Sequence, residues 1–205
     1  MAGYGLRPVN FASGGYSSGG FTEYPIASST DGATGGETDD MYTGHFMLQE
    51  ASGYVTEMAA SPDGTTSLLS TVGVAVGFRY INSDGEPVWS QKYTGNAANQ
   101  EAYAFIADDP TQQFLIQQDS VGNAVGQGAV GLNGQVIQGT GSNSTGLSGM
   151  VLDSSAVAAT ATFPLRIVGF PKDGTNENAV GTTTTNNLTV QINPVVHQRL
   201  RATGL

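Results

Sequence analysis

TVGVAVGFRYI, at residues 71–81, carries the clearest structural signal in the chain. Large apolar side chains recur in it at every second position, the period of a β-strand, at Val72, Val74, Val76, Phe78 and Tyr80. Glycines take the opposite face at positions 73 and 77, which allows close backbone approach or a bulge. We therefore predict a buried strand whose large side chains share one face of the core. The expected neighbours of that face include Phe105, Phe114, Leu165, Ile167 and Val190.

The sequence on either side of this strand contains turn signals and further short strands. Asn82-Ser83-Asp84-Gly85 is typical of a tight turn, so we expect a hairpin to residues 87–93. Residues 61–64, SPDG, form a second turn signature. Similar runs of β-forming residues occupy 21–28, 41–49, 53–58, 102–107, 113–117, 134–138, 163–170 and 188–192.

Helical patterns are nearly missing from the sequence. Apolar residues nowhere recur at helical spacing over three turns, although Ser154 or Ser155 could cap one helical turn at 156–159. Many short strands separated by turns indicate a β-barrel or a sandwich. The predicted fold class is therefore all-β, a β-barrel or sandwich body with an extended N-terminal arm.

The 205 residues suit one domain with extensions at its ends. We predict an extended arm at residues 1–20, a β-barrel or sandwich domain at 21–193 and a C-terminal tail at 194–205. The glycine-rich stretch at 122–149 is long for a loop, and we expect it to cover or extend the body.

The charge balance limits the classes of partner. The chain has seven basic and 17 acidic residues and a net charge of −10, with no basic stripe, so we expect no nucleic-acid partner. No apolar run approaches the roughly 20 residues of a membrane helix, and no secretion signal opens the chain, so we expect no membrane partner. Cysteine is absent, which excludes disulfides and thiolate chemistry.

Residues that could carry chemistry are few. The two histidines, His45 and His197, lack any catalytic or metal-binding motif, so we interpret both as structural. Residues 126–131 match GxGxxG, but no helix is expected after them, so we predict no dinucleotide site. The prediction is that the protein is not an enzyme and has no cofactor and no metal.

Calcium is an alternative that the sequence leaves open, because calcium takes oxygen ligands from loops. The two candidate groups are Asp108 with Asp109 and Asp119, and Asp31 with Glu37, Asp39 and Asp40.

The first 20 residues combine glycines with isolated large side chains. A free linker has no use for repeated apolar anchors, so the segment is expected to become ordered on a surface. That surface is either a partner protein or the chain's own domain, and the sequence favours neither. The anchors are Tyr4, Leu6, Pro8, Phe11 and Tyr16.

Four blocks of the sequence resemble a family of virion proteins. They are YGLRPV at 4–9, AYAFIADDPTQQFLIQQD at 102–119, STGLSGMVLD at 144–153 and FPLRIVGF at 163–170. Together they resemble the capsid decoration, or cement, proteins of tailed bacteriophages, of the group found in phages of cyanobacteria and other aquatic bacteria. The likeness covers most of the chain and is weakest between residues 30 and 70, where the loop at 31–40 is longer than the family pattern.

The resemblance implies a structural protein that binds the outer surface of the major capsid shell and stabilises it. The partners implied are the major capsid protein and the chain itself in a small homo-oligomer, most readily a trimer. The location implied is the outer surface of the virion, after synthesis in the host cytoplasm. The residues that we expect at the capsid interface are Tyr4, Leu6, Arg7, Pro8 and Phe11.

Three other functions stay open. A receptor-binding or fibre-tip β-domain would recognise a host glycan or protein through exposed aromatic residues. A head-completion or tail-tube protein would assemble into rings. A virion depolymerase would need a pair of carboxylates in a cleft.

Overall fold

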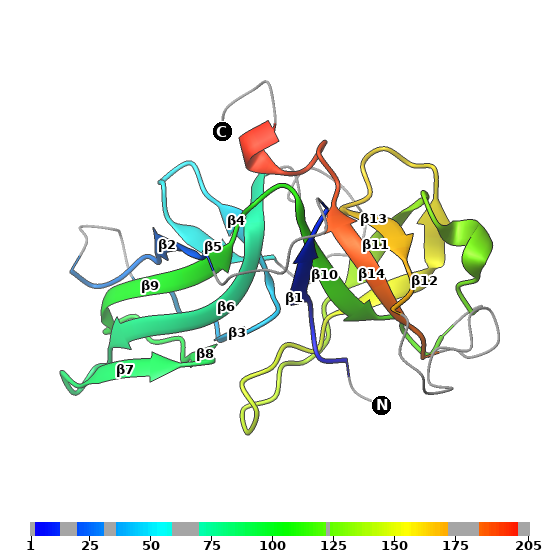
Figure 1. Cartoon of the computed structure of the whole chain (residues 1–205). Helices are drawn as coiled ribbons and strands as arrows, with labels where there is room; N and C mark the ends of the chain where they lie inside the picture. Colours follow the sequence, from blue (N-terminus) through cyan, green and yellow to red (C-terminus); the bar gives the residue numbers. More distant parts are fainter. Residues whose placement is uncertain are drawn as a thin grey trace.

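A computed structural model describes residues 3–12, 20–30, 36–58, 70–121, 124–171 and 185–200. These ranges contain strands and short 3₁₀ turns but no α-helix, which confirms the predicted all-β class (Figure 1). None of the helical turns in these ranges is long and apolar enough to cross a membrane. The turn expected at 61–64 lies outside the described residues.

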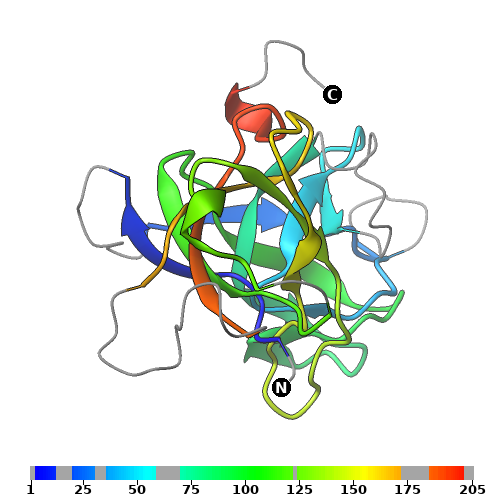
Figure 2. The ribbon, with the colours of Figure 1, turned by 90° about the vertical axis from the view of Figure 1, so that its right-hand side faces the viewer.

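The strands form two antiparallel six-stranded sheets, which lie side by side in Figure 1. The path of the first sheet is β1 (Arg7–Phe11), β10 (Gln112–Gln117), β14 (Asn187–Ile192), β13 (Leu165–Gly169), β11 (Asn133–Ile137) and β12 (Val151–Ala158). Figure 2 shows that the ribbons of these strands are strongly curved. A single bridge between Gln118 and Leu152 brings the ends of β10 and β12 together without closing a barrel. Several antiparallel sheets without a closed barrel are consistent with a β-sandwich and not with the barrel alternative.

The second sheet is built around the strand that the sequence singled out. Its path is β2 (Thr22–Pro25), β9 (Gln100–Ala107), β6 (Thr71–Ile81), β4 (Phe46–Gln49) and β5 (Val55–Glu57), with β7 (Pro87–Ser90) paired to β6. A ribbon of β3 (Met41–Tyr42) and β8 (Lys92–Tyr93) lies beside it. The β6–β7 hairpin confirms the turn at Asn82–Gly85, in which Asn82 Oδ1 accepts the backbone N–H groups of Asp84 and Glu86.

Two hydrophobic cores form, rather than one. The first contains side chains of both sheets and joins them, including Phe46 from β4, Phe114 from β10 and Val190 from β14. The second lies between the second sheet and the β3–β8 ribbon, and includes Met41 and Tyr93.

The expectation that β6 presents one apolar face was wrong. Val74 and the partly buried Val76 pack in the first core, whereas Val72, Phe78 and Tyr80 pack in the second. The pairing with β4 skips Val72 and the pairing with β9 skips Val76. Each bulge adds one unpaired residue, which moves the following side chains to the opposite face of the sheet.

Four of the five expected neighbours of β6 lie in the first core. They are Phe114, Leu165, Ile167 and Val190, and of the β6 residues Val74 is buried with them, as predicted. Phe105 is only partly buried, and it belongs to neither core.

The structure differs from the sequence analysis at three further segments. Residues 156–158 lie in strand β12 and not in a helical turn. Residues 7–11 form β1, which pairs with β10, so the described part of the expected arm belongs to the body. Residues 194–200 are no free tail, because Val196 and His197 are buried.

Candidate functional site

The residues predicted at the capsid interface lie in or next to β1, but they do not form one surface. Tyr4 and Arg7 meet, with the Arg7 guanidinium 4.3 Å from the centre of the Tyr4 ring. The Tyr4 hydroxyl donates a hydrogen bond of 2.8 Å to Asn187 Oδ1, and burial raises its pKa to about 12, against the opposing effect of Arg7. Arg7 is exposed, and Pro8 is half-buried.

Leu6 is the exception among these residues, because its side chain is fully buried in the first core. Its backbone N–H donates to the Gly44 carbonyl at 3.1 Å. The preceding Gly5 has a φ of +77°, and a Cβ there would lie 2.1 Å from Ser148 Oγ. Residues 5 and 6 are therefore closely packed against the rest of the domain. The prediction that Leu6 faces a partner was wrong, because its side chain is buried in the core. Phe11 pairs through its backbone with Gln112.

Neither histidine is arranged for nucleophilic catalysis. His45 is buried with its Nδ1 atom 2.6 Å from Glu57 Oε2. The Nδ1 atom of His197 accepts a hydrogen bond of 3.3 Å from the Arg199 backbone N–H. Burial and the Arg199 charge lower the pKa of His197, so this imidazole is held neutral. Neither ring is hydrogen-bonded to a hydroxyl group in the described part of the chain.

The carboxylates considered for calcium have other partners. Asp108 accepts a hydrogen bond of 2.8 Å from the Tyr24 hydroxyl and pairs with Arg199. Asp109 accepts the Thr111 N–H at 2.7 Å. Within the described ranges, no three His, Asp or Glu side chains come together as metal ligands would. Asp31 of the second group lies outside these ranges.

The segment that matches GxGxxG forms no phosphate cradle. Residues 127–129 make a single 3₁₀ turn, η2 (Gln127–Ala129), and strand β11 follows. Because a strand and not a helix follows the glycines, this segment offers no helix N-terminus to a pyrophosphate.

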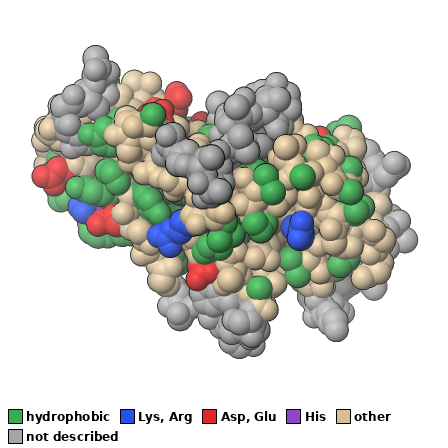
Figure 3. Space-filling model, turned by 90° about the horizontal axis from the view of Figure 1, so that it is seen from above, with side chains coloured by type: hydrophobic (Ala, Val, Ile, Leu, Met, Phe, Trp, Pro, Cys, Tyr) green, Lys and Arg blue, Asp and Glu red, His purple; other side chains and the backbone are tan. Residues whose placement is uncertain are grey.

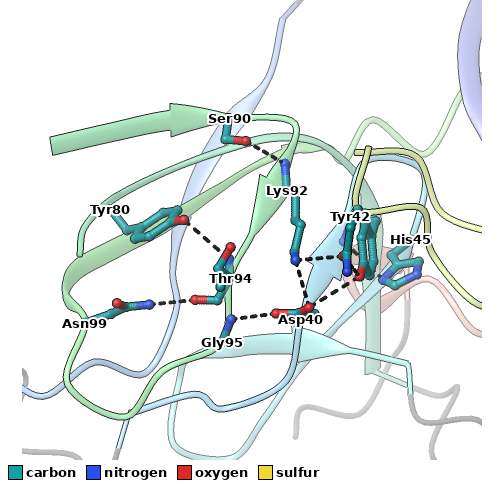
Figure 4. Close-up of polar contacts among 10 residues, drawn as sticks. Asp40, Tyr42, His45, Tyr80, Ser90, Lys92, Thr94, Gly95 and Asn99 are labelled. Atoms are coloured by element: carbon teal, nitrogen blue, oxygen red, sulfur yellow. Dashed lines mark hydrogen bonds and ion pairs between the residues drawn. The ribbon is translucent and has the colours of Figure 1, made fainter. Parts of the chain in front are cut away.

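A polar network that the sequence analysis missed surrounds the side chain of Lys92 in β8 (Figure 4). The Lys92 ammonium lies 2.8 Å from Asp40 Oδ2 and donates to Asn143 Oδ1 at 2.8 Å. The Tyr42 hydroxyl donates to the same Asn143 oxygen at 2.6 Å, and the Gly95 N–H donates to Asp40 Oδ1 at 2.9 Å. Three segments distant in the sequence, 40–42, 92–95 and the loop at Asn143, therefore meet at this point.

The electrostatics of the network keep both ions charged. Burial alone would raise the pKa of Asp40, but hydrogen bonds from Lys92 and Gly95 and the Lys92 charge outweigh it and lower this pKa. Burial alone would lower the pKa of Lys92, but Asp40 outweighs it and raises this pKa. The ion pair is thus complete at neutral pH, and its charges cancel locally.

An open groove of about 510 Å³ runs beside this network. One wall runs from the end of β7 into β8 and is formed by residues 89–92 with Thr94, and the other wall is the loop at 143–146. The volume falls in the usual range of ligand-binding clefts, about 300–1,000 Å³. No lining residue is acidic, and Lys92 is the only cation among them.

Trp89 is one of the residues that line the groove, and it is the only tryptophan in the chain. Its side chain is 72% exposed, and its ring stacks on Phe105 with centroids 5.7 Å apart and an angle of 18° between the planes. A lone tryptophan in a strand was visible in the sequence, but its outward direction was not.

Comparisons of the chain with models of protein families, with curated proteins and with solved structures find no match.

Proposed function

We propose that this protein is a structural virion protein that binds the outer surface of the major capsid shell of a tailed phage and stabilises it. The observation that carries the proposal is the resemblance of four sequence blocks to capsid decoration proteins. Three of these blocks supply strands of the first sheet: β1, β10 and β13. The fourth supplies the loop wall of the groove and the start of β12.

The surface of the domain supports a structural role outside a DNA-filled shell. On the face that Figure 3 shows, charged groups are few, and most of the surface is apolar or uncharged polar. With a net charge of −10, the protein is repelled by nucleic acid and not drawn to it. A sparse distribution of charge also lowers the desolvation cost of forming a broad protein interface.

The contact with the shell is proposed to use the outer side of β1, with Tyr4, Arg7 and Pro8 facing the partner. Leu6 has a different role, because its burial fixes the segment on the domain before binding. Ordering a free chain costs roughly 1–2 kcal/mol per residue, so a segment that is already fixed binds without that cost.

The position of β1 supports this assignment. Among the strands that the structure describes, β1 is at the edge of the first sheet and pairs with β10 alone. The other side of an edge strand presents backbone N–H and C=O groups that a strand of another protein can pair with. A strand of the major capsid protein is the proposed occupant.

Two measurements test the proposal. The copy number in purified virions should be comparable to that of the major capsid protein, whereas a few copies per particle would favour a fibre or connector. Capsids stripped of decoration should co-sediment with the purified protein, and Arg7→Glu should weaken this binding at least about tenfold, as for an interface hot spot.

The matched control for that binding assay is Arg166→Glu. Arg166 is also an exposed arginine of the first sheet, but it lies on β13 away from β1. The control should bind as the unaltered protein does. Equal binding of both variants would remove β1 from the interface, and no binding by the unaltered protein would refute the function itself.

A further inference from the structure

We propose that the groove between Trp89 and the 143–146 loop is a binding site for an uncharged sugar unit of an oligosaccharide or polysaccharide. The ring of Trp89 would stack on the apolar face of the sugar, and the polar wall would bond to its hydroxyl groups. None of the residues that line this groove belongs to β1, and the inference does not depend on the capsid function proposed above.

The aromatic part of the site is a rigid platform. Trp89 stacks on Phe105, so one face of the indole is supported while the side chain as a whole stays 72% exposed. Tryptophan is highly buried on average, and an exposed ring that lines a groove gains free energy when a ligand covers it. A pyranose ring presents C–H groups on its flat faces, which match an aromatic face of this kind.

The polar wall supplies hydrogen-bond donors that are fixed in position. An ammonium group has only donors, so the Asn143 atom 2.8 Å from Lys92 Nζ must be the oxygen. That oxygen also accepts the Tyr42 hydroxyl, and no residue in the described ranges accepts the two N–H groups of the exposed Asn143 amide, so these two donors can bond to a ligand. Thr94 and Ser144 add hydroxyl groups to the same groove.

The charge of the groove selects the class of ligand. Lys92 is its only charged lining residue, and the ion pair with Asp40 cancels that charge. The site therefore offers no net attraction to an anion, and the net charge of −10 repels acidic polymers at long range. Neutral sugars have no such penalty.

Both walls are held in place without a ligand. The Thr43 N–H donates to the Gln91 carbonyl at 2.9 Å and to the Gly146 carbonyl at 3.0 Å. Thr43 therefore links the 143–146 loop to the other wall of the groove, between β7 and β8. Gly146 has a φ of +69°, and a Cβ there would lie 2.7 Å from the Gln91 Cβ. Such a preformed groove binds with little ordering cost.

Because Trp89 is the only tryptophan, its fluorescence reports directly on the site. The probes are dextran, mannan, galactan and chitooligosaccharides as uncharged ligands, and alginate as an acidic one. We expect at least one uncharged probe to shift the emission and to protect the indole from acrylamide quenching, with no effect of alginate. Failure of all four uncharged probes, or equal binding of alginate, would overturn the proposal.

Variants are compared by affinity electrophoresis in gels that contain the probe that binds. Trp89→Ala should weaken binding at least about tenfold, and Trp89→Phe should recover part of it, because a ring face is restored. Asn143→Asp keeps the acceptor for Lys92 and Tyr42 but removes both N–H donors, and it should also weaken binding.

The control is Val121→Ala, which trims another exposed apolar side chain, 75% accessible and outside the groove. Melting curves of all four variants identify any that do not fold. The proposal is overturned if folded Trp89→Ala and Asn143→Asp bind as tightly as the Val121→Ala control.

Discussion

Replacing Leu6 by alanine should destabilise the whole domain, although the residue lies only six positions from the N-terminus. Its side chain is fully buried in the core that joins the two sheets. The substitution removes three buried carbon atoms, and at roughly 0.8 kcal/mol each the transfer of these atoms costs about 2.4 kcal/mol. The cavity adds to this, so we expect a loss of about 3–4 kcal/mol in the free energy of unfolding.

The loss should be measured by urea unfolding, followed by far-UV circular dichroism, with a melting curve as a second measure. For a chain of this size, about 3–4 kcal/mol corresponds to a fall in Tm of roughly 6–16 °C. Arg7→Ala is the matched control, since it alters the exposed neighbour in the same segment and should cost within about 1 kcal/mol. A loss below about 1 kcal/mol for Leu6→Ala would show that the N-terminal segment is an arm independent of the core.

Two further predictions concern the core and the pH dependence of stability. Phe114→Ala removes a fully buried ring of the first core and should cost roughly 3–5 kcal/mol in the same urea assay, and a loss below about 1 kcal/mol would contradict its place in the core. Burial and Arg199 lower the pKa of His197 from 6.5, so the unfolded chain takes up a proton as the pH falls below about 6.5, whereas the folded protein takes it up only at a lower pH. Stability is therefore lost as the pH falls below about 6.5, and His197→Gln should show a smaller loss over the same pH range. An unchanged pH dependence in that variant would mean that His197 does not contribute to it.

The alternation of apolar residues was sufficient to predict most strands. Side chains of a strand point alternately to its two faces, so a half-buried strand leaves a period of two in the sequence. The β6–β7 hairpin was predictable for a related reason, because the bonds from Asn82 are local and Gly85, with a φ of +83°, suits its turn position.

Other strands left no such pattern. β12 reads VLDSSAVA, with serines and alanines that fit a strand edge as well as a helix start, and its pairing with β11 determined its conformation. β1 contains a proline and follows glycines, so its composition resembles a linker, yet pairing with β10 and the burial of Leu6 hold it in the sheet. Long-range partners overrode local propensity in both cases.

The groove could not be predicted from the sequence at all. Its network joins Asp40, Tyr42, Lys92 and Asn143, which come from segments up to 103 positions apart in the numbering, and none of them stands in a motif. Only the fold brings these side chains within hydrogen-bond distance.

The amino-acid sequence by itself determined the all-β class, the positions of most strands and turns, and the low, acidic surface charge, because these follow from local periodicity and composition. The tertiary structure decided which face each side chain of β6 presents, since two bulges arise from pairing with β4 and β9 and not from the residues of β6 alone. It also decided that Leu6 is core while Trp89 is exposed. Burial is a property of contacts between distant segments, and a side chain's own hydrophobicity does not fix which contacts it makes.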